Sequence, residues 1–156
     1  EQAGGKLGAL SSVFEIQVVH DIWVARARKL AQQAKGPLPP MPITLTASER
    51  RMMTPLPTFE VLYAEGEEMH HCLGTLDHQL DLARAGRFYA FSLTFPERAT
   101  LAVRREHDGP WVLYDVSGPC NAAVSDAMQR AAYAMVERFE RARTEPRQLV
   151  MDLSAT

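Results

Sequence analysis

Hydrophobic residues recur at helical spacing near the start of the chain. Apolar positions three to four residues apart predict a helix over 12–34. The segment 36–42 is rich in proline, which fixes φ and removes amide donors, so we expect an extended connector there. This pattern divides the chain into an N-terminal helical arm with its connector, 1–43, and a main α+β domain, 44–156.

A short helix is predicted at the start of the main domain. Thr46 and Glu49 have the capping-box spacing that begins a helix. Pro55 and Pro57 follow and should end it, because neither can continue a helix.

Two further helices are predicted before the pattern changes. Helical spacing continues over 58–72, with Gly74 suited to a left-handed cap and Cys72 placed near the inward stripe. A shorter helix is expected over 76–85, ending at Gly86.

The period of the hydrophobic pattern then changes from helical to alternating. Residues 88–94 and 99–103 alternate around a Pro-containing turn, which predicts a hairpin. A third strand is expected over 111–116, bounded by turn residues. Together these segments predict a three-stranded antiparallel sheet.

A long amphipathic helix is predicted after the sheet, opened by Asn121 or Ser125 and ending near Arg143. The residues 148–153 could add a last short strand. The order of the elements is an N-terminal helix, two helices, a three-stranded antiparallel sheet and a long C-terminal helix. This order is typical of the α+β class.

Composition and charge narrow the classes of protein that the chain could represent. It has 156 residues, 46% of them hydrophobic, which suits one domain with a real core, and its net charge of -2 does not favour a generally basic nucleic-acid binder. Two cysteines in a chain of this size favour free thiols and a cytoplasmic protein. We find no apolar run long enough to span a membrane and expect no membrane association.

His70, His71 and Cys72 place two imidazoles and a thiol in consecutive positions. Such groups transfer protons, attack substrates or bind metals, but neighbours on a helix point about 100° apart, so at most two can serve one site. The spacing of these residues and of His78 lacks the offsets of common zinc sites. A divalent metal is possible but is not supported by this spacing, and we assign no metal ligand.

Several short motifs, taken in order, resemble the PcfJ-like domain, a family found in proteins of plasmids, phages and other mobile genetic elements. The resemblance covers about 56–139. The motifs are Glu65-Gly66, His71-Cys72-Leu73-Gly74, Gly86, Arg98-Ala99-Thr100-Leu101, Trp111 and Gly118-Pro119-Cys120-Asn121. The resemblance to this family identifies candidate residues but implies no established reaction.

The chain departs from the pattern of this family at two positions. Many members have Glu two residues after the Thr, where this chain has Ala102, and Gln three residues before the Gly, where it has Asp115. A mechanism that needs the Glu would be absent here, although Asp115 could supply a carboxylate instead.

The second half of a site is expected at the end of the third strand. Asp115 and Asn121 lie at a strand end and in the loop before a helix, where polar side chains often face clefts. Asn121 could equally be a helix cap. Arg98 and Thr100 could be solvated turn residues, or Arg98 could contact phosphate.

The sequence therefore predicts a polar cluster of four candidate catalytic residues, which are His71, Cys72, Asp115 and Asn121. Arg98, Thr100 and His70 are the candidates for substrate binding. One hypothesis is an enzymatic domain that acts on nucleic acid or nucleotides, with His71 as general acid or base. The other is a non-catalytic module that binds a protein partner, in which the same cluster is structural.

Overall fold

The computed structural model describes residues 13–145, which fold as an α+β domain with a four-stranded antiparallel sheet. The helices are α1 (Val13–Gln33), α2 (Ala47–Met52), α3 (Phe59–Met69), α4 (Asp77–Arg84) and α5 (Asp126–Thr144), and a short 3-10 turn, η1 (Pro119–Asn121), precedes the last. The strands are β1 (Met53–Pro55), β2 (Phe88–Leu93), β3 (Ala99–Arg105) and β4 (Trp111–Ser117), in the order β1-β2-β3-β4. The predicted α+β class is confirmed.

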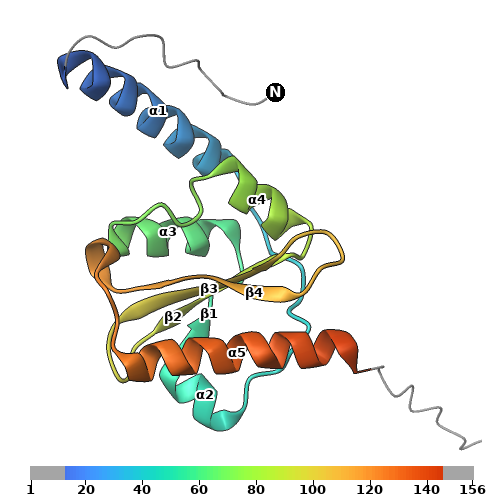
Figure 1. Ribbon diagram of the computed structural model, residues 1–156. Helices are drawn as coiled ribbons and strands as arrows, with labels where there is room; N and C mark the ends of the chain where they lie inside the picture. Colours follow the sequence, from blue (N-terminus) through green and yellow to red (C-terminus); the bar gives the residue numbers. More distant parts are fainter. Residues whose placement is uncertain (1–12, 146–156) are drawn as a thin grey trace, which may run out of the picture.

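The sheet lies between two layers of helices, with α3 and α4 on one face and α5 on the other (Figure 1). Successive strand residues point to opposite faces, so β2 and β3 supply both cores. Phe91 and Leu101 belong to the core on the α5 side, together with Phe139. Phe88 and Leu62 belong to the core on the side of α3 and α4.

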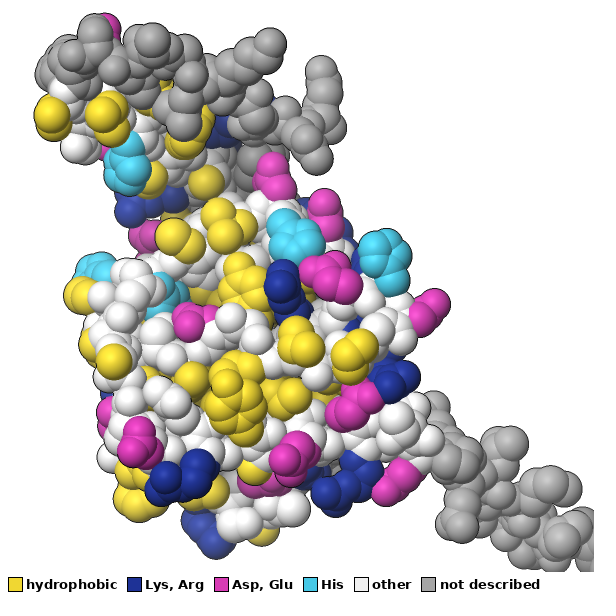
Figure 2. All heavy atoms as spheres, viewed as in Figure 1, with side chains coloured by type: hydrophobic (Ala, Val, Ile, Leu, Met, Phe, Trp, Pro, Cys, Tyr) yellow, Lys and Arg dark blue, Asp and Glu magenta, His cyan; other side chains and the backbone are white. Residues whose placement is uncertain are grey.

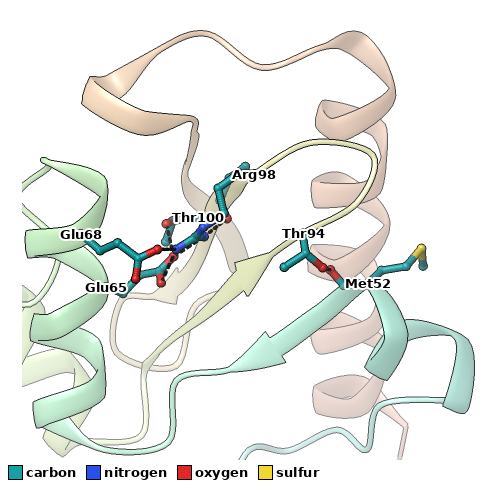
Figure 3. A network of polar contacts seen from close by, with 7 residues as sticks. Met52, Glu65, Glu68, Thr94, Arg98 and Thr100 are labelled. Atoms are coloured by element: carbon teal, nitrogen blue, oxygen red, sulfur yellow. Dashed lines mark hydrogen bonds and ion pairs between the residues drawn. The ribbon is translucent and has the colours of Figure 1, made fainter.

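The expectation of three strands is wrong, because β1 adds a fourth. The predicted short helix ends at Met52, and the next three residues pair with β2 through the register Met53↔Leu93 to Pro55↔Phe91. Proline is tolerated in this edge strand because its missing amide is not needed by a second neighbour. The amide of Thr94 donates to the carbonyl of Met52 at 3.0 Å and extends the pairing (Figure 3).

Helix α3 ends earlier than the hydrophobic pattern predicts. Its last residue is Met69, and His70 adopts a left-handed conformation with φ of 55° that turns the chain out of the helix. Cys72 is therefore exposed in a loop and does not lie on an inward helical stripe, whereas Leu73 is buried. Gly74 does adopt the left-handed conformation expected of it, with φ of 70°, but within this loop.

The N-terminal helix α1 projects from the body, and only its C-terminal part lies near α3 and α4 (Figure 1). The Pro-rich connector is extended and packs on the domain. Leu38 of the connector is buried in the core beside α3 and α4, and the Tyr89 hydroxyl donates to the carbonyl of Pro40 at 2.9 Å. The segment 148–153, predicted as a last strand, lies outside the described residues.

The long helix α5 begins with Ser125 as its N-cap, since the Ser125 hydroxyl accepts from the amide of Met128. Asn121 does not cap this helix. It lies in the turn η1 with a left-handed φ of 58°. This settles the choice that the sequence left open between the two residues.

Candidate functional site

The loop after α3 is held against that helix by a close approach at Gly66. The amide of His71 donates to the carbonyl of Gly66 at 3.0 Å. A Cβ atom on Gly66 would lie 2.4 Å from the carbonyl oxygen of Leu73, closer than real Cβ contacts allow. Glycine at this position is therefore what lets the loop fold back and place His71 and Cys72 beside the sheet.

The sheet supplies the opposite wall of the site. Thr100 of β3 faces α3, since its hydroxyl donates to the carboxylate of Glu65 at 2.6 Å. Ala102 lies two residues further along the same face and pairs directly with Asp115 of β4. Residues opposite each other in an antiparallel pair project to the same face, so Asp115 joins this wall.

These segments enclose a pocket of about 290 Å³, which we call the inner pocket. The loop, the sheet and the turn η1 each contribute side chains to it. The lining residues are His71, Cys72, Leu73, Leu76, Gln79, Thr100, Ala102, Tyr114, Asp115 and Asn121. The structure thus brings all four candidate catalytic residues, and Thr100, to one pocket.

His71 is a half-buried titratable group that lines this pocket. Its Nε2 atom is buried and has no hydrogen-bond partner among residues 13–145. Burial lowers the pKa of His71, because it disfavours the charged form, and the negative charges of Asp115 and Glu65 oppose that shift only in part. The lowered pKa favours the neutral imidazole, which is the form that can accept a proton.

Asp115 is an exposed carboxylate at the edge of the pocket. One of its oxygens accepts a hydrogen bond from the Ser117 hydroxyl at 2.8 Å. This bond helps to orient the carboxylate, whose charge favours the protonated form of His71. Proton uptake by the imidazole would therefore be stabilised by a neighbouring negative charge.

Behind the pocket, Glu65 is the centre of an ionic network that joins α3 to β3. Its carboxylate receives two hydrogen bonds of 2.8 Å from the Arg98 guanidinium, in addition to the one from Thr100 (Figure 3). Burial would raise the pKa of Glu65, but these hydrogen bonds outweigh it and hold the pKa below its usual range. Glu65 is therefore ionised and paired.

Arg98, expected as a substrate-binding residue, is occupied by this network. Besides Glu65, its guanidinium donates to Glu68 at 3.0 Å and to the carbonyl of Ala99 at 3.1 Å. It is not among the residues that line the inner pocket. The structure therefore gives Arg98 the role of an ion-pair partner instead of the solvated or phosphate-facing role expected from its turn position.

Gln79 of α4 fixes the other end of the loop. Its Oε1 accepts from the amide of Gly74 at 2.9 Å, and its Nε2 donates to the Tyr114 hydroxyl at 3.0 Å. A buried amide with both ends satisfied ties the loop to the helix and to β4 at once. This contact positions the wall of the pocket, which both Gln79 and Tyr114 line.

His70 faces a second, adjoining hollow of about 460 Å³ between the loop and α1, which we call the outer groove. The inner pocket and the outer groove share four lining residues, which are His71, Cys72, Leu76 and Asn121. Figure 2 shows histidine side chains on the projecting α1 and at separate places on the body below it, with hydrophobic side chains between them. The chain turns out of α3 at His70, so this residue lines the outer groove and not the inner pocket.

Sequence reasoning did not assign roles to Glu65, Gln79 or Tyr114. A signal for Glu65 was present, because a carboxylate on the apolar stripe of a helix needs a buried partner. For Tyr114 the only local signal was its place on the strand that ends in Asp115. The partner of Gln79 comes from a distant strand, so its role required the structure.

Among residues 13–145, we find no cluster of three or more His, Cys, Asp or Glu side chains that could hold a metal ion. None of the helices within the same residues combines the length and apolar character needed to cross a bilayer.

Comparison of the chain with protein-family models, with curated proteins and with solved structures found no significant match.

Proposed function

We propose that this chain is a PcfJ-like enzymatic domain of a mobile-element protein, which acts on nucleic acid or nucleotides with His71 as its general base. One observation carries this proposal. His71 lines the inner pocket, its buried Nε2 atom has no hydrogen-bond partner among the described residues, and burial keeps the pKa of its imidazole below the usual value of 6.5. A neutral imidazole next to bound substrate can accept a proton from water or from a substrate hydroxyl.

Asp115 supports this chemistry as an electrostatic partner of His71. When His71 takes up a proton, the charge of Asp115 stabilises the imidazolium that forms. The two positions at which the sequence departs from the family pattern, Ala102 and Asp115, are direct partners in the β3–β4 register. The carboxylate that the family pattern places at position 102 of β3 would thus be supplied by Asp115, the opposite residue on β4.

The other two candidate catalytic residues would complete the pocket wall. The amide of Asn121 can donate to a substrate oxygen and accept from a substrate hydroxyl or amine. The Cys72 thiol is exposed at the shared edge of the pocket and groove, where it can contact substrate. We assign the proton transfer itself to His71.

The proposal is tested by replacing His71 with glutamine. Hydrolysis of labelled DNA, RNA and nucleotides is measured with the purified chain and with the His71→Gln variant. Removing a general base is expected to lower the rate of the reaction found by about 100-fold or more. His78→Gln is the control, because His78 is exposed and pairs with Glu106 away from the pocket, and its rate should equal that of the wild type.

Equal rates for wild type and His71→Gln, or no turnover of any of these substrates, would contradict the enzymatic proposal. Circular dichroism and thermal melting of both variants show whether the fold is retained. A folded His71→Gln variant with normal turnover would leave His71 without the role that we propose.

A non-catalytic module for protein binding is the second candidate. The observation in its favour is that two polar networks, around Glu65 and around Gln79, fasten the loop and helices to the sheet. On this alternative, His71→Gln lowers stability and no turnover is found. The Nε2 atom of His71 has no hydrogen-bond partner in the part of the chain that the structure describes, which favours the enzymatic proposal, since a purely structural imidazole would normally be hydrogen-bonded.

A further inference from the structure

The outer groove combines an aromatic side chain with basic side chains, next to the proposed base. Trp23 of α1 lines the groove with 44% of its surface exposed. Arg28 and His20 line the same groove from α1, and His70 lines it from the loop. An exposed indole offers a flat surface for stacking, and guanidinium and imidazole groups are donors to phosphate.

The charges of these basic groups are only loosely engaged within the protein. Arg28 lies 3.6 Å from Glu67, and both side chains are about half exposed, so this pair is weak. His20 contacts Asp21 at 3.1 Å, also at the surface. A phosphate can therefore compete for Arg28, which differs in this respect from the firmly paired Arg98.

The inner pocket differs from the outer groove in the charged side chains that line it. None of the described residues that line the inner pocket is a lysine or an arginine, and Asp115 gives it negative character. A phosphate is therefore disfavoured within the inner pocket and favoured in the groove. Because the two hollows share His71 and Asn121, one ligand can occupy both.

We propose that the outer groove binds one nucleotide unit, with its base stacked on Trp23 and its phosphate at Arg28, so that the adjoining part of the ligand reaches His71. This inference rests on the proposed function and names the part of the substrate that is recognised. The ligand chemistry, a planar base joined to a phosphate, is shared by free nucleotides and single-stranded nucleic acid. Stacking on an aromatic side chain serves both, because every base has a flat face.

The two tryptophans of the chain make the test direct. Trp23 is exposed, whereas Trp111 is 5% exposed in the core. Adenosine monophosphate and a short single-stranded oligodeoxynucleotide are titrated into the full chain while tryptophan fluorescence is recorded. We expect both to quench the Trp23 component at low salt and to bind more weakly as salt rises. Ribose 5-phosphate, which has no base, should cause no quenching.

Variants then locate the binding site. Affinity is measured by calorimetry, and Trp23→Ala is expected to weaken nucleotide binding by about tenfold. Arg28→Ala should weaken binding of the nucleotide but not of adenosine, which has no phosphate. Ile22→Ala is the matched control, because Ile22 is 60% exposed on the same helix and does not line the groove; its affinity should be unchanged.

The source of the ligand follows from the same titrations. Similar affinities for the mononucleotide and the oligonucleotide would indicate a free nucleotide, and much tighter binding of the oligonucleotide would indicate single strands. No quenching by either, or equal affinities for Trp23→Ala and the wild type, would overturn the inference.

Failure of this inference is distinguishable from failure of the proposed function. If binding depends on Trp23 but no turnover depends on His71, only the enzymatic proposal is contradicted. If turnover depends on His71 but no nucleotide binds in the groove, only this inference is contradicted.

Discussion

Replacing Gly66 with alanine is expected to lower the free energy of unfolding by about 3 kcal/mol, the upper end of the usual cost of overpacking. Alanine favours a helix over glycine by about 1 kcal/mol, so an unconstrained helix position would gain stability. At Gly66 the new Cβ would meet the carbonyl oxygen of Leu73 at 2.4 Å, and that atom belongs to the backbone. The clash can be relieved only by moving the backbone of α3 or that of the loop that carries His71.

Urea denaturation of Gly66→Ala and of a control glycine variant measures this effect. Gly118→Ala is the control, because Gly118 has an ordinary φ of -78° and a Cβ there would meet its nearest neighbours at 3.5 Å. Its stability should stay close to that of the wild type. A Gly66→Ala variant as stable as the wild type would show that the loop does not approach α3 as closely as described.

Replacing Glu65 with glutamine is expected to lower the free energy of unfolding by about 3 kcal/mol, because it leaves a partly buried guanidinium without its buried carboxylate partner and with only the exposed Glu68 as a counter-charge. Glu65 is 6% exposed and accepts from both Arg98 and Thr100. Glutamine keeps the size of the side chain but removes the charge and puts an amide donor where a carboxylate oxygen accepts. Equilibrium denaturation at neutral pH measures the loss.

Glu68→Gln is the matched control for Glu65→Gln. Glu68 binds the same guanidinium, but its side chain is 69% exposed, so its removal should cost less than about 1 kcal/mol. The pKa of Glu65 lies below its ordinary value of 4.5, so its stabilising charge is present above that pH and is lost as the pH falls. The difference between wild type and Glu65→Gln should therefore shrink in acid. Equal losses for both variants would contradict the network.

The helices and central strands could be predicted because their signals are local. The capping box at Thr46 and the alternation over 88–94 both correspond to elements of the structure. Strand β1 could not be predicted, because three residues ending in Pro55 become a strand only by pairing with β2, about forty positions away. A partner so distant in sequence leaves no periodic pattern.

Part of the site could also be predicted from local motifs, whereas contacts between residues distant in sequence could not. The motif residues His71, Cys72, Asp115 and Asn121 could be selected from the sequence, and they line one pocket. The sequence places the end of α3 too late. Leu73 is buried because the loop folds back, and a buried leucine at this spacing looks like the next apolar position of the helix. The engagement of Arg98 was missed because its partner Glu65 lies on another element.

A pH titration of the His71 ring by NMR measures the pKa on which its role as a base depends. The His71→Gln variant identifies the signal. The account predicts a pKa below the ordinary value of 6.5 in the wild type, because the imidazole is buried. It predicts a lower pKa still in Asp115→Asn, because the charge of Asp115 favours the protonated form. A His71 pKa at or above 6.5, or one that Asp115→Asn leaves unchanged or raises, would contradict the account.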